Sequence, residues 1–335
     1  LTIGSGGTVT TLTNAGTASN AGDVGTLSNT GGIFTNTGNV TGTSSVTGGA
    51  LDNDGGTLTG DVTVGTNGIL TTSGDVQGTI ANDGITTVTD GSVADLENAG
   101  NATVSGGVVA DLDNSGSGDL TIGSGGTVTT LSNSSTASNA GEVGTLTNTG
   151  GTFTNTGTVS GSTTITDGTV TNNGGSFGGD VTIEGDANAT LSLETDTAIN
   201  GNVVNNGTIE ANGSSSISLD VTGGHSLTNT GTLNGGTHGL DITADEIYLS
   251  ETSIVGTGVN LIGDTTNEIS FGSATQDFRT NNSSRLDISN SGVRLGGTGA
   301  RVTSITNSDS LGTSDTVLCT QGNVKAYADT KLPLA

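Results

Sequence analysis

The carboxylates of the segment DLDNSGSGD, residues 111–119, are the side chains whose spacing points most directly to chemistry. Asp111, Asp113, Ser115 and Gly116 occupy the early positions of a calcium-binding loop of the type D-x-[DN]-x-[DN]-G. The twelfth position is Ile122 instead of Glu, so the bidentate ligand is missing. The segment therefore predicts a weak structural calcium site that uses Asp111, Asp113 and Asp119, and we expect no other cofactor.

Catalysis is not indicated by the remaining polar residues. His225 and His238 lie near Gly-rich turns without a third ligand-type residue at metal spacing, and no nucleophile has a base at a suggestive distance. Acid pairs hydrolyse glycosides, but carboxylates such as Asp52 and Asp83 are scattered over turns without aromatic residues to stack on sugar rings. Cys319 is alone and cannot form an internal disulfide. We expect a protein that is not an enzyme.

Charge is distributed unevenly along the chain. Residues 1–278 hold 28 of the 32 acidic residues and no Lys or Arg, and all six basic residues follow Phe278. An acidic body repels nucleic acid and anionic membranes, so neither is expected as a partner. No apolar run approaches the roughly 18 residues of a membrane span, which argues against insertion. The sequence starts without Met or a signal-peptide pattern, and we expect a processed chain or an internal portion of a longer one.

A repeat determines the elements that carry these residues. Residues 1–12 return unchanged as residues 120–131, and a looser match at the same offset of 119 continues to about residue 183. Within each copy a unit G-x-V-x-x-L-x-N-x-G recurs every 15 or 16 residues. Short units of β-branched and turn residues indicate stacked coils, because a helical repeat needs Ala, Leu, Glu and Lys. The sequence therefore predicts an all-β, elongated parallel β-solenoid.

The shared place of the apolar residues in the unit predicts which side chains point inward. Val and Leu of the unit form the core, Asn stacks in an amide ladder along the axis, and two Phe in equivalent positions fill the core. The inward set is Val9, Leu12, Val24, Leu27, Val128, Leu131, Val143 and Leu146, the ladder includes Asn14, Asn29, Asn133 and Asn148, and the two core aromatics are Phe34 and Phe153.

Composition fits a thin core better than a globule or a disordered linker. Only 29% of the residues are hydrophobic and 60 are Gly, yet the aliphatic residues recur at ordered intervals. Coils of about 15–19 residues with a rise of about 4.8 Å would extend some 240 residues into a rod of roughly 60–75 Å. Thr-x-Thr pieces such as residues 8–10 are typical of an ice-binding face, but they do not recur at one place in every coil, so that function is not expected.

The C-terminal region resembles known sequences. Residues 283–299, SSRLDISNSGVRLGGTG, are similar to a segment of bacteriophage tail fibres with the form E-R-M-R-I-D-S-S-G-N-V-G-I-G. Residues 310–332 resemble fibre sequences of the form T-E-K-A-V-K-x-Y-V-D, and residues 178–191 resemble fibre repeats. The departures from the second form are Cys319, Gly322 and Ala328. The matching positions of the first form are Arg285, Leu286, Ile288, Ser289, Ser291, Gly292, Val293 and Gly296.

This resemblance implies a homotrimeric, elongated virion component that attaches to a host-cell receptor and assembles with other virion proteins. We expect solenoid regions at residues 1–119 and 120–240, an interwoven, trimerising β segment at 241–308, and a C-terminal segment at 309–335 with a short helix near residues 322–332. In the trimer, Arg285 and Arg294 would pair with acids of a neighbouring chain. The solenoid equally resembles autotransporter adhesins, so a bacterial surface adhesin or extracellular filament subunit stays open as the alternative.

Overall fold

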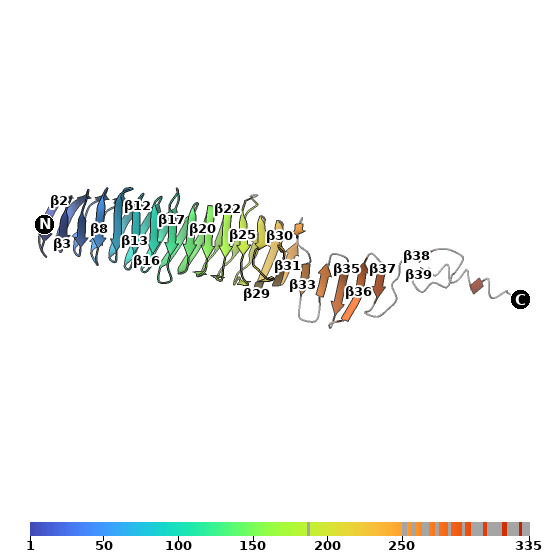
Figure 1. Cartoon of the computed structure of the whole chain (residues 1–335). Helices are drawn as coiled ribbons and strands as arrows, with labels where there is room; N and C mark the ends of the chain where they lie inside the picture. The colour runs from blue at the N-terminus through green and yellow to red at the C-terminus, as the bar shows by residue number, and fades with distance from the viewer. Residues whose placement is uncertain are drawn as a thin grey trace.

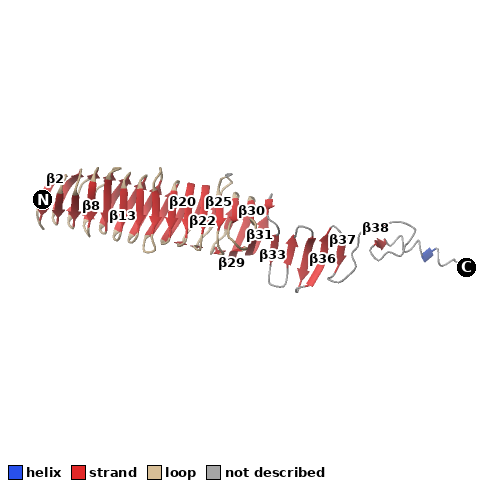
Figure 2. Ribbon diagram, viewed as in Figure 1, coloured by secondary structure: helices blue, strands red, loops and turns tan. Residues whose placement is uncertain are grey.

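The structure, a computed structural model, is an all-β rod of parallel strands stacked as a solenoid of about 14 turns. It describes residues 1–185 and 188–249, strands at 253–255, 259–262, 268–271, 275–280, 283–289, 292–295, 304–306 and 317–319, and residues 328–329. The coils follow one another along the axis from the N-terminus, with the C-terminal strands at the far end (Figures 1 and 2). The predicted parallel β-solenoid is confirmed. Within this described part, no helix has the length and apolar character to cross a membrane.

Each coil has three short sides. In the first complete coil, Val9 points inward from side 1, Leu12 and Asn14 from side 2, and Ala18 and Asn20 from side 3. Inward residues are two apart within a side, as strand alternation requires, but three apart between sides 1 and 2, where the chain bends. Small residues and Gly occupy the corners, because the backbones of successive coils come close there.

Sides 1 and 2 are formed by β2 (Thr8–Asn14), β4 (Asp23–Asn29), β6 (Asn39–Val40) with β7 (Ser44–Val46), β9 (Thr57–Leu58) with β10 (Val62–Val64), β12 (Asp75–Asn82), β14 (Ser92–Asn98), β16 (Val108–Asn114), β18 (Thr127–Asn133), the first half of β20 (Glu142–Asn155), β21 (Thr158–Val159) with the first half of β22 (Thr163–Asn172), β23 (Ser176–Phe177) with β24 (Val181–Ile183), β26 (Thr197–Ala198) with β27 (Val203–Asn205), β29 (Ile217–Asn229) and β31 (Leu240–Leu249).

Side 3 is formed by β1 (Thr2–Ile3), β3 (Thr17–Asn20), β5 (Ile33–Asn36), β8 (Gly49–Asn53), β11 (Gly68–Thr72), β13 (Ile85–Val88), β15 (Asn101–Val104), β17 (Asp119–Ile122), β19 (Thr136–Asn139), the second halves of β20 and β22, β25 (Thr190–Leu193), β28 (Thr208–Ala211), β30 (Thr232–Asn234) and β32 (Ser253–Val255).

The 119-residue repeat corresponds to seven coils. In-register pairing on side 1 leads from Val9 to Val128 in seven steps, through Val24, Val40, Leu58, Val76, Val93 and Val109. The twelve identical residues therefore recur at the same place in the coil, seven coils apart. Later coils are longer, because Val181 pairs with Val203 and Val203 with Leu227. The additional residues of these later coils do not interrupt the parallel stacking of the strands.

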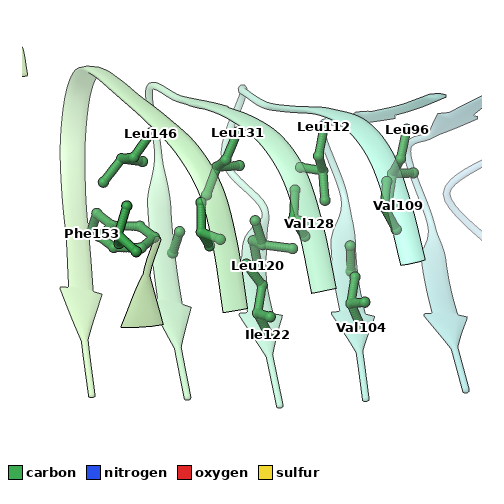
Figure 3. Close-up of a cluster of buried hydrophobic side chains, with 14 of the residues drawn as sticks. Leu96, Val104, Val109, Leu112, Leu120, Ile122, Val128, Leu131, Leu146 and Phe153 are labelled. Atoms are coloured by element: carbon green, nitrogen blue, oxygen red, sulfur yellow. The ribbon is translucent and has the colours of Figure 1, made fainter. Parts of the chain in front are cut away.

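The core is a narrow column of aliphatic side chains along the axis (Figure 3). Seven of the eight predicted inward residues are buried, and Val9 is partly buried in the first coil. Phe34 and Phe153 are both fully buried at matching positions of side 3, as predicted. Complete burial of a Val or Leu side chain stabilises a fold by about 1.5–3 kcal/mol, so repetition gives a thin core substantial stability.

Buried asparagines form the predicted ladders beside this column. On side 2, Asn82, Asn98, Asn114, Asn133 and Asn148 are linked by amide hydrogen bonds of 2.7–2.8 Å. Every Nδ2 donates to the Oδ1 of the next coil, so the ladder has one direction, and the last Nδ2 donates to the carbonyl of Asp167 at 2.8 Å. The first acceptor, Asn82 Oδ1, is buried without a hydrogen-bond partner.

The four asparagines predicted to form a ladder are joined two by two through the same type of amide hydrogen bond. Asn14 donates to Asn29 and Asn133 donates to Asn148, each at 2.7 Å. A second ladder on side 3 runs from Asn20 through Asn36 to Asn53 and ends on the Thr72 hydroxyl, a feature that the sequence analysis did not assign. Backbone ladders and amide ladders thus both run along the rod axis.

The strand pairing changes to antiparallel after the last coils. The strands involved are β33 (Val259–Ile262), β34 (Glu268–Phe271), β35 (Thr275–Thr280), β36 (Ser283–Ser289) and β37 (Gly292–Leu295). The fibre-like segment at residues 283–299 contains a hairpin, because β36 and β37 pair from Leu286–Leu295 to Ser289–Gly292. Two further strands, β38 (Ser304–Thr306) and β39 (Val317–Cys319), pair in parallel.

The predicted C-terminal helix is not supported. Within residues 322–332 the structure describes Ala328 and Asp329, which have helical backbone, and two residues do not make a helix. The rest of that segment, including Gly322, and the side chain of Cys319 lie outside the described residues.

Candidate functional site: the outer columns of the solenoid

The predicted calcium ligands lie in extended strands instead of a loop. Asp111 and Asp113 are exposed on the outside of β16, and Asp119 is exposed at the start of β17 on side 3. Strand alternation turns the intervening Leu112 inward, so these carboxylates do not wrap around a common point. In the part of the chain that the structure describes, no three His, Cys, Asp or Glu side chains are grouped to hold a metal ion.

Carboxylates instead face their counterparts on the neighbouring coil. Asp95 is in register with Asp111, and Glu97 with Asp113, so four carboxylates share the outer surface of β14 and β16. Adjacent strands are about 4.8 Å apart, and like charges directly opposite each other destabilise a sheet. The charge of one of the four, Asp95, is partly compensated by a hydrogen bond of 2.9 Å from the Thr79 hydroxyl. This cluster makes side 2 strongly electronegative near the middle of the rod.

Other titratable residues are dispersed over the described surface. His225 is partly buried in β29, and His238 is exposed beside the Thr237 hydroxyl, at 2.9 Å from its Nδ1. Arg294, assigned by the sequence analysis to an acid of a neighbouring chain, forms a 2.8 Å ion pair with Asp287 of its own chain. That pair links the two strands of the β36–β37 hairpin.

Tyr248 is the most exposed aromatic residue of the solenoid. Its hydroxyl donates a 2.6 Å hydrogen bond to Glu246 Oε2, two residues before it on β31. This hydrogen bond and the carboxylate charge raise the pKa of Tyr248 above its usual value of 10.0. The phenol therefore stays neutral, as a hydrogen-bond donor, at the end of the parallel stack.

Hydroxyl side chains form an ordered column on the outside of side 3. Strand register brings Thr-x-Thr and Thr-x-Ser pairs together in four consecutive coils, although such pairs do not recur in every coil. These pairs are Thr136/Ser138, Thr152/Thr154, Thr169/Thr171 and Thr190/Ser192. Ser192 is covered and only 3% exposed, so the accessible hydroxyls of these pairs end at Thr190. The column of their second members extends back through Thr121, Thr103, Thr87 and Thr71. The unit V-x-x-L-x-N conceals this pattern because side 3 lies outside it.

The outer column beside these hydroxyls is apolar in four early coils. Ile33, Ala50, Ile69 and Ile85 stack in register, and we call these four residues the isoleucine strip. The three isoleucines are 51%, 40% and 45% exposed, in a chain whose other aliphatic residues mostly form the core. Contiguous apolar surface of this kind is typical of interaction sites. The second copy has threonines on this column, including Thr152 and Thr169, so the isoleucine strip distinguishes the two copies.

Sequence reasoning missed the isoleucine strip because it assigns exposed and buried positions by residue type. A signal is present in the pieces IFT, ILT and ITT, residues 33–35, 69–71 and 85–87, where an aliphatic residue precedes an outward threonine by two positions. Since strand alternation places residues i and i+2 on one face, such an isoleucine must share the outer face of the threonine.

The fold defines a class, the β-solenoid repeat proteins. Comparison of the chain with protein-family models, with curated proteins and with solved structures finds no match. The likeness of residues 283–332 to tail fibres thus stays a prediction from sequence.

Proposed function

We propose that the protein is a non-enzymatic, structural and host-attachment fibre of a phage-like particle. The observation that carries the proposal is the uninterrupted stack of about 14 coils on one axis, followed by antiparallel strands that contain the fibre-like segment. Each coil adds about 4.8 Å of length, so the solenoid spans roughly 65–70 Å. Such a rod separates two ends, as an attachment fibre requires.

Attachment in this proposal uses shallow, repeated contacts. The isoleucine strip offers apolar surface beside a column that contains the hydroxyls of Thr35, Thr71 and Thr87 and the carboxylate of Asp52. That combination suits the apolar faces and hydroxyl groups of a cell-surface glycan, and a homotrimer would gain avidity from three copies of a weak site. The carboxylates of the body would repel an acidic glycan, so a neutral surface glycan is the ligand that best suits this surface.

Adsorption of the purified protein to a panel of bacterial cells and their isolated surface glycans tests the proposal. A triple variant, Ile33→Thr, Ile69→Thr and Ile85→Thr, gives the first copy the residue type that the second copy has on this column. We expect adsorption by the parent protein without release of new reducing ends, and at least tenfold weaker adsorption by the variant. The matched control, Thr147→Ser with Thr164→Ser on side 2, should adsorb normally.

Two outcomes would reject parts of this proposal. Sustained release of reducing ends would identify a glycan-cleaving enzyme, and adsorption that the triple variant retains would move the contact away from the isoleucine strip. The alternative, a bacterial surface adhesin or extracellular filament subunit, is distinguished by labelling: antibody to the protein would decorate the bacterial envelope and not purified particles. The fibre proposal requires label on the particles.

A further inference from the structure

A groove lies at the corner between side 3 and side 1 in the second copy. Its volume is about 450 Å³, within the range of about 300–1,000 Å³ that small-molecule sites have. The corner at residues 123–126 is four residues long, whereas the corners of the next two coils, at 140–141 and 156–157, have two residues each. The longer corner therefore projects beyond the shorter ones, and its Ser124 and Gly125 line the groove.

The floor of the groove is bare backbone, and the stacking of the coils requires this. A Cβ on Gly141 would lie 2.3 Å from the carbonyl oxygens of Gly123 and Gly126. A Cβ on Gly157 would lie 2.3 Å from the carbonyl oxygen of Gly141. No side chain can therefore cover this floor, and a ligand can approach the main chain closely.

The polar wall of the groove consists of residues from three successive coils. Thr127, Glu142 and Thr158 stack in register where side 1 begins, and Ser124 adds a hydroxyl from the longer corner. Glu142 is exposed, and within the described residues its carboxylate has no hydrogen-bond or ion-pair partner. The Ser176 hydroxyl donates to Thr158 at 3.4 Å, so the Thr158 hydroxyl still has a hydrogen to donate. The wall thus offers two carboxylate oxygens that accept and hydroxyls that both donate and accept.

The first copy has the same corner, but its carboxylate is already bonded. Seven of the nine residues that line the groove are identical 119 positions earlier, and the two differences are Asp23 for Glu142 and Asn39 for Thr158. Asn39 Nδ2 donates to Asp23 Oδ1 at 3.0 Å. In the second copy this amide is absent and the acidic side chain is one methylene longer, so its carboxylate stays available to a ligand. We call Asp23 with Asn39 the closed pair and Glu142 with Thr158 the open pair.

We propose that this groove is a saccharide site that binds one neutral hexose unit of a cell-surface glycan. The Glu142 carboxylate accepts hydrogen bonds from two neighbouring hydroxyls of the ring, and the hydroxyls of Thr127 and Thr158 pair with others. The inference deepens the proposed attachment function, because it adds a glycan contact in the second copy to the isoleucine strip of the first. It rests on that function for the choice of a surface glycan, whereas its test uses isolated sugars.

The composition of the groove favours a neutral polyhydroxyl ligand over other classes of small molecule. Residues 1–278 contain 28 acidic residues and no Lys or Arg, so an anionic ligand is repelled. Ala140 has the one apolar side chain of the lining, so an apolar ligand gains little. An ammonium group would pair as well with any other exposed carboxylate, and exposed ion pairs contribute little. A hexose uses the carboxylate and the hydroxyls together.

Saturation-transfer NMR of the full chain with the methyl glycosides of glucose, galactose and mannose tests the proposal. We expect the parent chain to bind at least one of the three with a millimolar Kd. Glu142→Gln should weaken this binding at least fivefold, because hydrogen bonds to a charged acceptor are roughly twice as strong as those between neutral groups. The matched control, Asp111→Asn, removes the same charge from a strand outside the groove and should bind the glycoside like the parent.

The two copies provide exchange variants that separate the groove from the rest of the surface. Glu142→Asp with Thr158→Asn gives the second copy the closed pair, and we expect it to lose glycoside binding. Asp23→Glu with Asn39→Thr gives the first copy the open pair, and we expect it to add a second site and so to double the glycoside bound per chain at saturation. Unchanged β circular dichroism shows that both variants fold.

Three results would overturn the inference: a parent chain that binds none of the three glycosides, a variant with two closed pairs that binds like the parent, or methylammonium binding that Glu142→Gln removes while no glycoside binds, which would identify a cation site. Cell adsorption separates this failure from failure of the proposed function. Adsorption without glycoside binding would reject the saccharide site and keep the attachment fibre. Glycoside binding without adsorption to any cell of the panel would keep the saccharide site and reject attachment.

Discussion

The buried asparagines show at the scale of single residues why position in a ladder matters more than burial. Replacing Asn114 by Val leaves the Nδ2 of Asn98 without an acceptor and the Oδ1 of Asn133 without a donor. Replacing Asn82 by Val removes an unpartnered oxygen and creates one on Asn98, so the number of unsatisfied acceptors is unchanged.

We therefore expect Asn114→Val to destabilise the chain by about 2–4 kcal/mol and Asn82→Val by about 1 kcal/mol, because each buried unsatisfied group costs about 1–3 kcal/mol. Val fits the column sterically, as Val46 and Val64 occupy it in other coils. Urea unfolding of the two variants measures the difference. An equal decrease in the free energy of unfolding for the two variants would show that each amide contributes on its own and that its position in the hydrogen-bonded ladder does not matter.

Close backbone approach at one corner gives a second residue-scale prediction. A Cβ on Gly118 would overlap the backbone of Gly100 on the preceding coil, whereas a Cβ on Gly16 would have no atom within 4 Å. We expect Gly118→Ala to destabilise the chain by about 1–3 kcal/mol, as other overpacking substitutions do. Gly16→Ala should be neutral or stabilising by up to about 1 kcal/mol, because it reduces the freedom of the unfolded chain. Thermal melts of both variants decide the matter.

Titration of Tyr248 provides a third prediction. Glu246 accepts the phenol hydrogen bond and carries a negative charge beside it, and both effects oppose ionisation. In Glu246→Gln the charge is gone, so the pKa of Tyr248 should fall toward its usual value. Ultraviolet difference absorbance measures this change, with Tyr248→Phe identifying which titration belongs to Tyr327. An unchanged titration would show that Glu246 does not contact the phenol in solution.

At the scale of elements, the facing carboxylates of β14 and β16 predict a dependence on salt. Asp113 is opposite Glu97, whereas Asp119 is next to Thr136 on its column. Asp113→Ser and Asp119→Thr each remove one negative charge and introduce the residue that the following coil has at that position.

We expect Asp113→Ser to stabilise the chain by about 0.2–1 kcal/mol at low salt, and Asp119→Thr to have a smaller effect. The gain in stability from Asp113→Ser should shrink as salt rises to about 0.5 M. The distance over which two charges interact is about 8 Å at physiological ionic strength, and it becomes shorter as salt is added. Melting temperatures across a salt series check this expectation. A gain that is independent of salt would contradict the electrostatic explanation.

The strands also show how far sequence reasoning extends. Val128, Leu131 and Asn133 could be assigned inward because the unit repeats them in register with fixed spacing. Ile69 could not, since the choice between two faces of side 3 depends on where the corner places Leu70. The calcium prediction took residues 111–119 as a loop, although their Leu and Asn continue the core pattern of the strand. Local motifs were thus weaker evidence than the repeat that contained them.

At the scale of the whole molecule, oligomerisation is predicted to reside in residues 279–335, which carry all six basic residues. A uniform stack can slip by one coil between chains, so a fibre needs a separate element that fixes register. We expect the full chain to sediment as a trimer and a chain ending at Phe278 to sediment as a monomer with unchanged β circular dichroism. A trimer of the shortened chain would place the assembly element within the solenoid or the strands next to it.

The axial direction of the hydrogen bonds between coils determines how the rod responds to tension. A force that pulls its ends apart acts along those bonds, and it opens the ladder of the outermost coil before those of the coils behind it. A coil contributes about 4.8 Å to the intact rod, yet its roughly 17 residues reach about 55–60 Å when drawn out. Detaching a single coil therefore lengthens the molecule by about ten times what that coil contributed. If the rod serves as the attachment fibre proposed above, it would therefore lengthen in small increments under load and absorb work before either end is released.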